Sequence, residues 1–267
     1  MRELTLDEAV GWTGGRLAEC GFFFDFDGTL ARIQDDPETV QPVASAPEAL
    51  AGLARLAGRT AVISARPVGF LAQRLGQVPG LGLYGLYGLE SSLDGGRTVD
   101  TLPTAEPYAA AVAEAVRDAR LAFPQALIED KRLACALHFR TAPETGPALV
   151  AWAQERGERE GLRVQHGRMV VELKPPVDWD KGAAVRAALP GLAGAWYFGD
   201  DLGDLPAFAE LERASAGSGG ENGELRGFRV AVTSAESDPR LIGQTQYRIE
   251  GPERVPAVLH RIIAAAG

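Results

Sequence analysis

The segment Phe22-Phe23-Phe24-Asp25-Phe26-Asp27-Gly28-Thr29-Leu30 decides the fold, because it joins an apolar run to two carboxylates and a turn signal. It predicts a buried strand over residues 22–26 that breaks at Gly28. Residues two apart on a strand point the same way, so Asp25 and Asp27 are expected to lie together at the strand end. Burying two charges is costly unless they are paired. We therefore expect a metal or a cationic partner there; a solvated acidic turn is the alternative.

The composition narrows the class of protein. The chain has 267 residues, 46% of them hydrophobic, and a net charge of −9. An acidic chain without a basic face is not expected to bind nucleic acid. Cys20 and Cys135 lie far apart, so no disulfide framework is predicted and the reducing cytoplasm is the expected compartment. Neither a signal peptide nor a membrane span is expected, and we expect a monomer.

Strands and helices alternate in the first part of the chain. Strands are predicted over residues 22–26, 60–64 and 83–85, and helices over residues 46–57 and 66–75. After the sequence Lys174-Pro175-Pro176 the alternation resumes, with helices over 181–189, 204–211 and 252–264 and strands over 195–199, 228–232 and 246–249. Residues 32–47 and 214–224 are predicted to be loops. This spacing indicates an α/β protein with a Rossmann-like, doubly wound parallel sheet.

The middle of the chain follows another pattern. Helices over residues 104–123 and 144–159 are each followed by two strands, over 126–129 and 133–139, then over 162–165 and 169–173. This αββαββ order is long enough for a small α+β domain. We therefore predict a core formed by residues 1–102 and 175–267, with an inserted domain over residues 103–174.

Polar residues follow several of the core strands, where open α/β sheets place their ligands. They are Asp25, Asp27, Ser64, Lys181, Asp200, Asp201 and Asp204. Carboxylates are hard oxygen ligands that suit Mg²⁺, while an ammonium and a hydroxyl can hold phosphate oxygens. Together these residues predict a combined anion and metal site.

Four motifs in this set resemble the haloacid dehalogenase superfamily of aspartyl-phosphate phosphatases: DFDGTL at residues 25–30, ISARP at 63–67, Lys181-Gly182 and GDDLGD at 199–204. More narrowly, the chain resembles trehalose-6-phosphate phosphatases. That resemblance rests on the segments 85–90, 128–131, 137–140, 171–175 and 199–208. It implies hydrolysis of a small sugar phosphate with Mg²⁺ as cofactor.

The resemblance also implies roles. Asp25 would be the nucleophile and Asp27 the general acid and base. Ser64 and Lys181 would stabilise the transferring phosphoryl group. Metal ligation would involve Asp25, Asp27 through its carbonyl, Asp200 and Asp204, the last either on the metal or orienting Lys181.

The inserted domain is similar to the family's cap, which closes over the sugar. The residues that the resemblance assigns to substrate are Arg66, Glu129, Lys131, Arg140 and Glu172. For the charged residues of the insert, a solvated hairpin turn and an exposed strand end are the alternative. His138 is expected on the same strand face as Arg140.

Two departures from the family pattern put the choice of sugar in question: Ala65 replaces a glycine, and Gly203-Asp204-Leu205 replaces Thr-Asp-Glu. Phosphatases of sucrose phosphate, glucosylglycerol phosphate or mannosylglycerate phosphate are therefore alternatives. A sugar phosphomutase and a sugar-phosphate sensor with a degraded site are two further alternatives. No glycosyltransferase domain is expected before residue 22.

Overall fold

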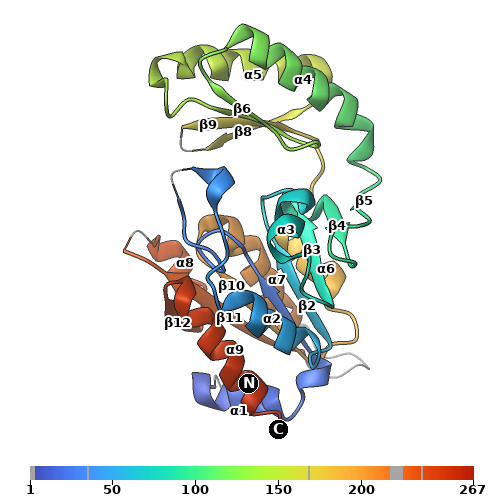
Figure 1. The fold of residues 1–267 in the computed structure, drawn as a ribbon, viewed down its shortest axis with the longest axis vertical. Helices are drawn as coiled ribbons and strands as arrows, with labels where there is room; N and C mark the ends of the chain where they lie inside the picture. Colours follow the sequence, from blue (N-terminus) through green and yellow to red (C-terminus); the bar gives the residue numbers. More distant parts are fainter. Residues whose placement is uncertain (1–3, 35, 168, 217–224, 236) are drawn as a thin grey trace. The chain divides into compact units, whose positions relative to one another are not determined.

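The computed structural model describes residues 4–34, 36–167, 169–216, 225–235 and 237–267. The chain divides into two compact units, coloured along the sequence in Figure 1. Unit 1 comprises residues 1–99 and 179–267, and unit 2 comprises residues 100–178. No helix in the described ranges has both the length and the apolar character needed to cross a membrane.

Unit 1 is built around a mainly parallel sheet whose strands follow the order β12-β11-β10-β1-β2-β3-β4. Neighbouring strands from β12 to β3 are parallel, and β3 pairs with β4 in the antiparallel direction. The strands are β1 (Cys20–Phe24), β2 (Arg59–Ile63), β3 (Leu81–Gly85), β4 (Glu90–Ser92), β10 (Gly194–Gly199), β11 (Arg226–Thr233) and β12 (Tyr247–Glu250).

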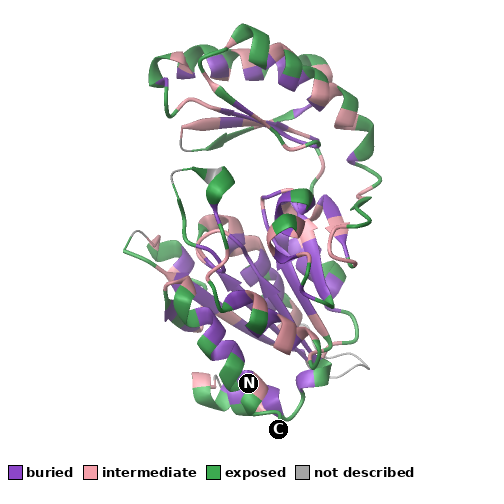
Figure 2. Ribbon diagram, in the orientation of Figure 1, coloured by how far each residue is buried: buried purple, intermediate pink, exposed green. Residues whose placement is uncertain are grey.

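Helices cover both faces of this sheet, as the predicted doubly wound fold requires. The apolar cluster on one face joins α1 (Leu6–Gly14), α2 (Ala46–Ala54), α3 (Val68–Leu75) and α9 (Val255–Ala264). The cluster on the other face joins α6 (Lys181–Ala188), α7 (Leu205–Ala216) and α8 (Pro239–Gly243). Phe22 and Phe24 belong to the first cluster and Phe23 to the second, so β1 is buried on both sides (Figure 2).

The end of β1 differs from the prediction by two residues. The strand ends at Phe24 rather than at residue 26. The carbonyl of Phe26 accepts hydrogen bonds from the amides of Leu30 and Ala31, at 2.9 and 3.0 Å, so the turn already begins there. Asp25 still continues the pairing, because its amide donates to the carbonyl of Phe198 at 2.9 Å. Asp25 and Asp27 are therefore not consecutive positions on one strand face.

Four further parts of the core differ from the prediction. The antiparallel strand β4 and the short helix α8 were not predicted, because both are brief and carry no clear periodicity. The predicted loop over residues 32–47 contains a short 3-10 turn, Pro37–Thr39. Residues 214–216 of the predicted loop over 214–224 belong to α7, which continues to Ala216, and residues 217–224 lie outside the described ranges.

Unit 2 packs two helices on one face of a small antiparallel sheet (Figure 1). Its sheet has the order β6-β7-β9-β8. The elements are the short strand β5 (Asp100–Thr101), α4 (Ala109–Ala122), β6 (Leu127–Asp130), β7 (Cys135–His138), α5 (Gly146–Glu160), β8 (Arg163–Gly167) and β9 (Val170–Lys174). The alternation along each strand sends one set of side chains toward the helices and leaves the other set on an open face.

Candidate active site

The centre of the site is a buried lysine held between two carboxylates. The Nζ atom of Lys181, at the first position of α6, lies 2.7 Å from Oδ1 of Asp25 and 2.7 Å from Oδ1 of Asp204. All three side chains are at least nine-tenths buried. Burying an ammonium is costly unless oxygens surround it, so this arrangement fixes the position of Lys181 against the end of β1.

Asp204 is fully occupied by hydrogen bonds. Its Oδ1 atom also accepts from the hydroxyl of Tyr197 at 2.8 Å. Its Oδ2 atom accepts from the backbone amides of Asp200 and Asp201, at 2.9 and 3.2 Å. The side chain therefore organises the turn after β10 and holds Lys181 at the same time. This geometry favours the anchoring role that was predicted as one of its two possibilities.

Asp200 lies against the turn of the opening segment. Its Oδ1 atom accepts from the hydroxyl of Thr29 at 3.4 Å. Gly28 has φ +79°, and a Cβ atom at this position would lie 1.9 Å from Oδ2 of Asp200. A glycine is thus required at this position for two reasons: its backbone conformation and the close approach of the Asp200 carboxylate.

Three carboxylates converge closely enough to hold a cation. One oxygen each of Asp25, Asp200 and Asp204 can be chosen so that all lie within 4.8 Å of one another. Burial raises the pKa of Asp25 to about 7, with Lys181 opposing the shift. Burial and the charge of Asp25 raise the pKa of Asp200 to about 10. This excess of negative charge is what a divalent cation would neutralise.

Lys181 shows the opposite balance of effects. Burial alone would lower its pKa, but the neighbouring charges of Asp204 and Asp25 raise the pKa well above the usual value. Lys181 is therefore a permanent positive charge at the end of β1. Such a charge can neutralise a phosphoryl oxygen without giving up a proton.

Asp27 has a different partner from Asp25. The guanidinium of Arg66 binds it through two hydrogen bonds, Nε to Oδ2 at 2.8 Å and Nη2 to Oδ1 at 2.9 Å. The same guanidinium lies 4.3 Å from the ring centroid of Phe70. The guanidinium of Arg66 therefore holds Asp27, and the substrate contact predicted for Arg66 stays a prediction. A bidentate contact of this kind fixes the orientation of a carboxylate.

Ser64 follows β2 and is 1% exposed. Its Oγ atom accepts from the amide of Arg66 at 3.2 Å. A cavity of about 300 Å³ brings the predicted residues of unit 1 together. The described residues that line it are Asp25, Asp27, Ile33, Gln34, Ser64, Ala65, Arg66, Tyr87, Lys181, Asp200, Asp201 and Gly203.

In unit 2, the open face of the sheet carries a second charged cluster. Lys131 Nζ lies 2.9 Å from Oε1 of Glu172 and 3.8 Å from Oε2 of Glu129. The Nε2 atom of His138 lies 3.0 Å from the same Oε2 of Glu129. Glu129 and Glu172 share one row of the sheet, because both pair with Ala136. Arg140 lies beyond β7, exposed, and is not part of this contact network.

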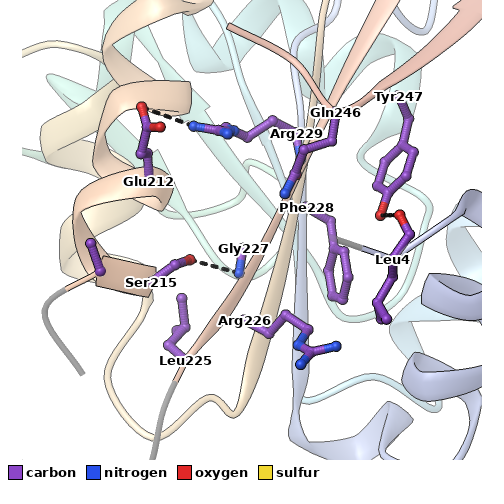
Figure 3. A pocket seen from close by; sticks show the side chains of 11 residues that line it. Leu4, Glu212, Ser215, Leu225, Arg226, Gly227, Phe228, Arg229, Gln246 and Tyr247 are labelled. Carbon is purple, nitrogen blue, oxygen red and sulfur yellow. Dashed lines mark hydrogen bonds and ion pairs between the residues drawn. The ribbon is translucent and has the colours of Figure 1, made fainter. Parts of the chain in front are cut away.

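Another cavity, of about 360 Å³, lies at the opposite ends of the core strands (Figure 3). Its polar groups pair with one another: Arg229 with Glu212 at 3.0 Å, and the amide of Gly227 with the hydroxyl of Ser215 at 2.8 Å. Among the described residues of its lining, none belongs to the predicted site. We therefore place the candidate active site at the carboxyl ends of the strands alone.

Two tyrosines of the site were not predicted. Tyr197 lies in an apolar strand and gives no signal in the sequence. Tyr87 lies in the segment Gly85-Leu86-Tyr87-Gly88 at the end of a strand, and these glycines are a weak signal for a special backbone turn. The rarity of lysine is a stronger signal: only three of the 27 basic residues are lysines, namely Lys131, Lys174 and Lys181. A compact ammonium fits between two carboxylates where the planar fork of arginine does not.

Solved structures share this fold over nearly the whole chain. The C-terminal domain of the trehalose-6-phosphate phosphatase of C. albicans aligns with a TM-score of 0.73 and 20% identity, covering 99% of this chain and 98% of that one. A haloacid dehalogenase-like hydrolase from Bacteroides thetaiotaomicron aligns with a TM-score of 0.58 and 14% identity, covering 91% and 97%. The fold is thus that of the haloacid dehalogenase-like hydrolases.

Sequence comparison narrows the class. The profile of the trehalose-phosphatase family matches residues 23–238. The trehalose-phosphate phosphatase of Mycobacterium avium is 38% identical over 272 residues, which cover 96% of this chain and 66% of that protein. The chain belongs to the trehalose-phosphatase family. It spans less than two thirds of the length of that relative.

Proposed function

We propose that the protein is a Mg²⁺-dependent phosphatase that hydrolyses trehalose 6-phosphate to trehalose and phosphate. The observation that carries this proposal is the buried contact of Lys181 with Asp25 at the carboxyl end of β1, close to Asp200. It places a carboxylate nucleophile, a fixed positive charge and a potential metal ligand in one cavity. Membership of the trehalose-phosphatase family supports the choice of substrate.

The reaction proceeds in two steps at Asp25. In the first, a carboxylate oxygen of Asp25 forms a bond to phosphorus while the bond from phosphorus to the sugar oxygen breaks. Asp27 donates a proton to the departing oxygen. In the second, water attacks the phosphorus of the aspartyl phosphate and gives a proton to Asp27, while the bond from phosphorus to the Asp25 oxygen breaks. Phosphate then leaves, and both carboxylates regain their starting state.

The neighbouring side chains orient these groups. Arg66 holds Asp27 through two hydrogen bonds, so the carboxylate can turn to the leaving oxygen only within the space that Arg66 allows. Lys181 and the Ser64 hydroxyl stabilise the charge that develops on the phosphoryl oxygens. Asp204 and Tyr197 act through Lys181, whose position they determine.

The carboxylate set fits Mg²⁺, which prefers hard oxygen ligands. Asp25, Asp200 and the backbone carbonyl of Asp27 would hold it, and Asp204 would anchor the turn behind them. When bound, the ion neutralises phosphate charge and orients the ester for attack. The raised pKa values of Asp25 and Asp200 support this assignment, because burial, and for Asp200 also the charge of Asp25, disfavours the ionised carboxylates, which a bound cation would stabilise.

Unit 2 supplies the sugar contacts in this proposal. Its cluster of Glu129, Lys131 and Glu172 offers acceptors and a donor at close range, which suits the hydroxyl groups of a disaccharide. Arg140 serves as a further, more exposed donor. The two cysteines are buried free thiols, which fits the reducing environment of the cytoplasm.

A phosphate-release panel tests the proposal. Trehalose 6-phosphate, sucrose 6-phosphate, glucose 6-phosphate and mannose 6-phosphate are each incubated with Mg²⁺ or with EDTA, and free phosphate is measured. We expect the fastest release from trehalose 6-phosphate with Mg²⁺ and none from the Asp25→Asn variant. Faster release from another sugar would reject the substrate assignment. Conversion of a sugar phosphate without free phosphate would indicate a mutase.

A further inference from the structure

The segment after β3 has an unusual backbone. Leu86, Tyr87 and Gly88 are three consecutive residues with positive φ, at 51°, 62° and 96°. Residues other than glycine rarely adopt this left-handed backbone region, and a tyrosine there is strained. Such strain persists only where the surroundings enforce it, and it gathers at functional sites. The segment therefore has a task that a relaxed turn would not perform.

This segment is bound to both elements that carry the proposed phosphate ligands. The amide of Tyr87 donates to the carbonyl of Ser64 at 2.8 Å, and the amide of Leu86 donates to the carbonyl of Arg66 at 2.9 Å. On its other side, a Cβ atom at Gly88 would lie 2.8 Å from the Cβ atom of Ala184 in α6, the helix that begins with Lys181. The turn thus sits between the Ser64 loop and α6.

A buried carboxylate at the end of the same segment makes a third hydrogen bond. Glu90, the first residue of β4, is 3% exposed, and its Oε2 atom accepts from the amide of Val68 at the start of α3, at 3.0 Å. Together with the two backbone contacts, this bond joins the segment to the Ser64 loop at three points. The position of Tyr87 is therefore set by the same contacts that set Ser64 and Arg66.

Held by these hydrogen bonds, Tyr87 is half-buried, and its side chain lines the cavity of the candidate active site. Among the described lining residues it is the one aromatic side chain. Asp25, Ser64 and Lys181 suit the charged phosphoryl end of a substrate. A phenol differs from them, because it combines an apolar ring with a single hydrogen-bonding group. A pyranose ring offers the matching surface, an apolar face with hydroxyl groups at its edge.

We propose that Tyr87 is a specificity-determining residue, whose ring packs against the sugar attached to the reacting phosphate and whose hydroxyl bonds to that sugar. The inference rests on the proposed phosphatase function and deepens it. It assigns part of the sugar recognition to the core, in the strained turn after β3, and leaves the phosphoryl group to Ser64 and Lys181.

The test compares a sugar ester with a phosphate that has no sugar. Tyr87→Asn removes the ring but keeps a residue that tolerates positive φ, and Tyr87→Phe removes only the hydroxyl. Each variant is assayed with trehalose 6-phosphate and with acetyl phosphate, and its thermal unfolding is recorded. Tyr84→Phe is the matched control, because Tyr84 lies in β3 and is outside the cavity lining.

We expect Tyr87→Asn to lower kcat/KM for trehalose 6-phosphate by roughly tenfold or more, mostly through KM, to leave acetyl phosphate turnover unchanged, and not to lower the unfolding midpoint. Tyr87→Phe should show a smaller loss in the same direction, and Tyr84→Phe none. Wild-type behaviour of both Tyr87 variants would overturn the inference. Equal losses on both phosphates would also overturn it, because Tyr87 would then act through the Ser64 loop.

Failure of the proposed function gives a different result. In that case the wild-type enzyme releases phosphate from acetyl phosphate but not from trehalose 6-phosphate. The same comparison is then made with the sugar phosphate that the wild type hydrolyses fastest. A selective loss there supports Tyr87 as a sugar contact, and an unselective loss rejects it.

Discussion

Gly28 lies against Asp200 in the proposed site, and Gly28→Ala tests how closely Asp200 must be placed. Gly28 has φ +79°, and an added Cβ atom would lie 1.9 Å from Oδ2 of Asp200. Contacts between such atoms are comfortable near 3.5 Å, so Asp200 would have to move by roughly 1.5 Å. The hydrogen bond from Thr29 to Asp200, already 3.4 Å long, would not survive that shift.

The size of the effect follows from two terms. An alanine in the left-handed region costs about 1–2 kcal/mol of folding free energy, partly offset by about 0.4–1 kcal/mol from the stiffer unfolded chain. Displacing a catalytic group by about 1 Å costs on the order of 100-fold in rate. We therefore expect Gly28→Ala to lower kcat/KM by about 100-fold, a loss that backbone strain alone does not explain.

Gly191→Ala is the matched control. Gly191 has φ +82°, yet an added Cβ atom would meet nothing within 4 Å. It should share the strain of Gly28→Ala and keep full activity. Phosphate release and thermal unfolding are measured for both variants at saturating Mg²⁺. If Gly28→Ala keeps wild-type kcat/KM, or if Gly191→Ala loses as much activity, the assignment of Asp200 to the reaction is refuted.

Four further outcomes are expected. Asp25→Asn should abolish phosphate release while circular dichroism stays that of the folded protein; normal turnover would rule out Asp25 as nucleophile. EDTA should stop phosphate release and added Mg²⁺ restore it, whereas activity that ignores chelation contradicts the metal assignment. Tyr197→Phe should lower the free energy of unfolding in urea by about 1–3 kcal/mol, because Asp204 loses a buried donor; an unchanged midpoint would contradict this. Lys131→Ala should raise KM for trehalose 6-phosphate but not for acetyl phosphate, with Arg132→Ala as control; equal losses would mean that Lys131 does not contact sugar.

Much of the fold could be predicted from the sequence, because long-range order in this class follows from local periodicity. Alternating strands and helices dictate a parallel sheet with helices on both faces, and this α/β prediction is confirmed. The end of β1 was misplaced by two residues. Phe26 is apolar and reads as strand, yet its carbonyl serves the turn that Gly28 allows. The apolar character of Phe26 correctly indicates that its side chain is buried, but it does not indicate an extended backbone.

The site was predictable where topology alone brings residues together. Parallel strands end at one edge, so Asp25, Ser64 and Asp200 were expected near one another, and they line one cavity. The pairing of Arg66 with Asp27 was not predictable, because it depends on how two flexible side chains meet across different loops. Tyr87 was hidden for another reason: its position depends on a left-handed backbone that no sequence period reports.

The charge balance of the cavity bears on whether a metal ion would also affect substrate binding. The described lining residues include four carboxylates, which face only Lys181 and Arg66 as positive groups. Arg66 is already bound to Asp27, and Lys181 to Asp25. A phosphate ester entering this cavity would add negative charge to a site in which burial, and for Asp200 also the charge of Asp25, already raises the pKa values of Asp25 and Asp200. We therefore expect a divalent cation to help the substrate bind as well as react, and chelation should weaken the binding of trehalose 6-phosphate to the inactive Asp25→Asn variant. Binding of equal strength with and without Mg²⁺, measured by calorimetry, would separate the two roles and confine the metal to the chemical step.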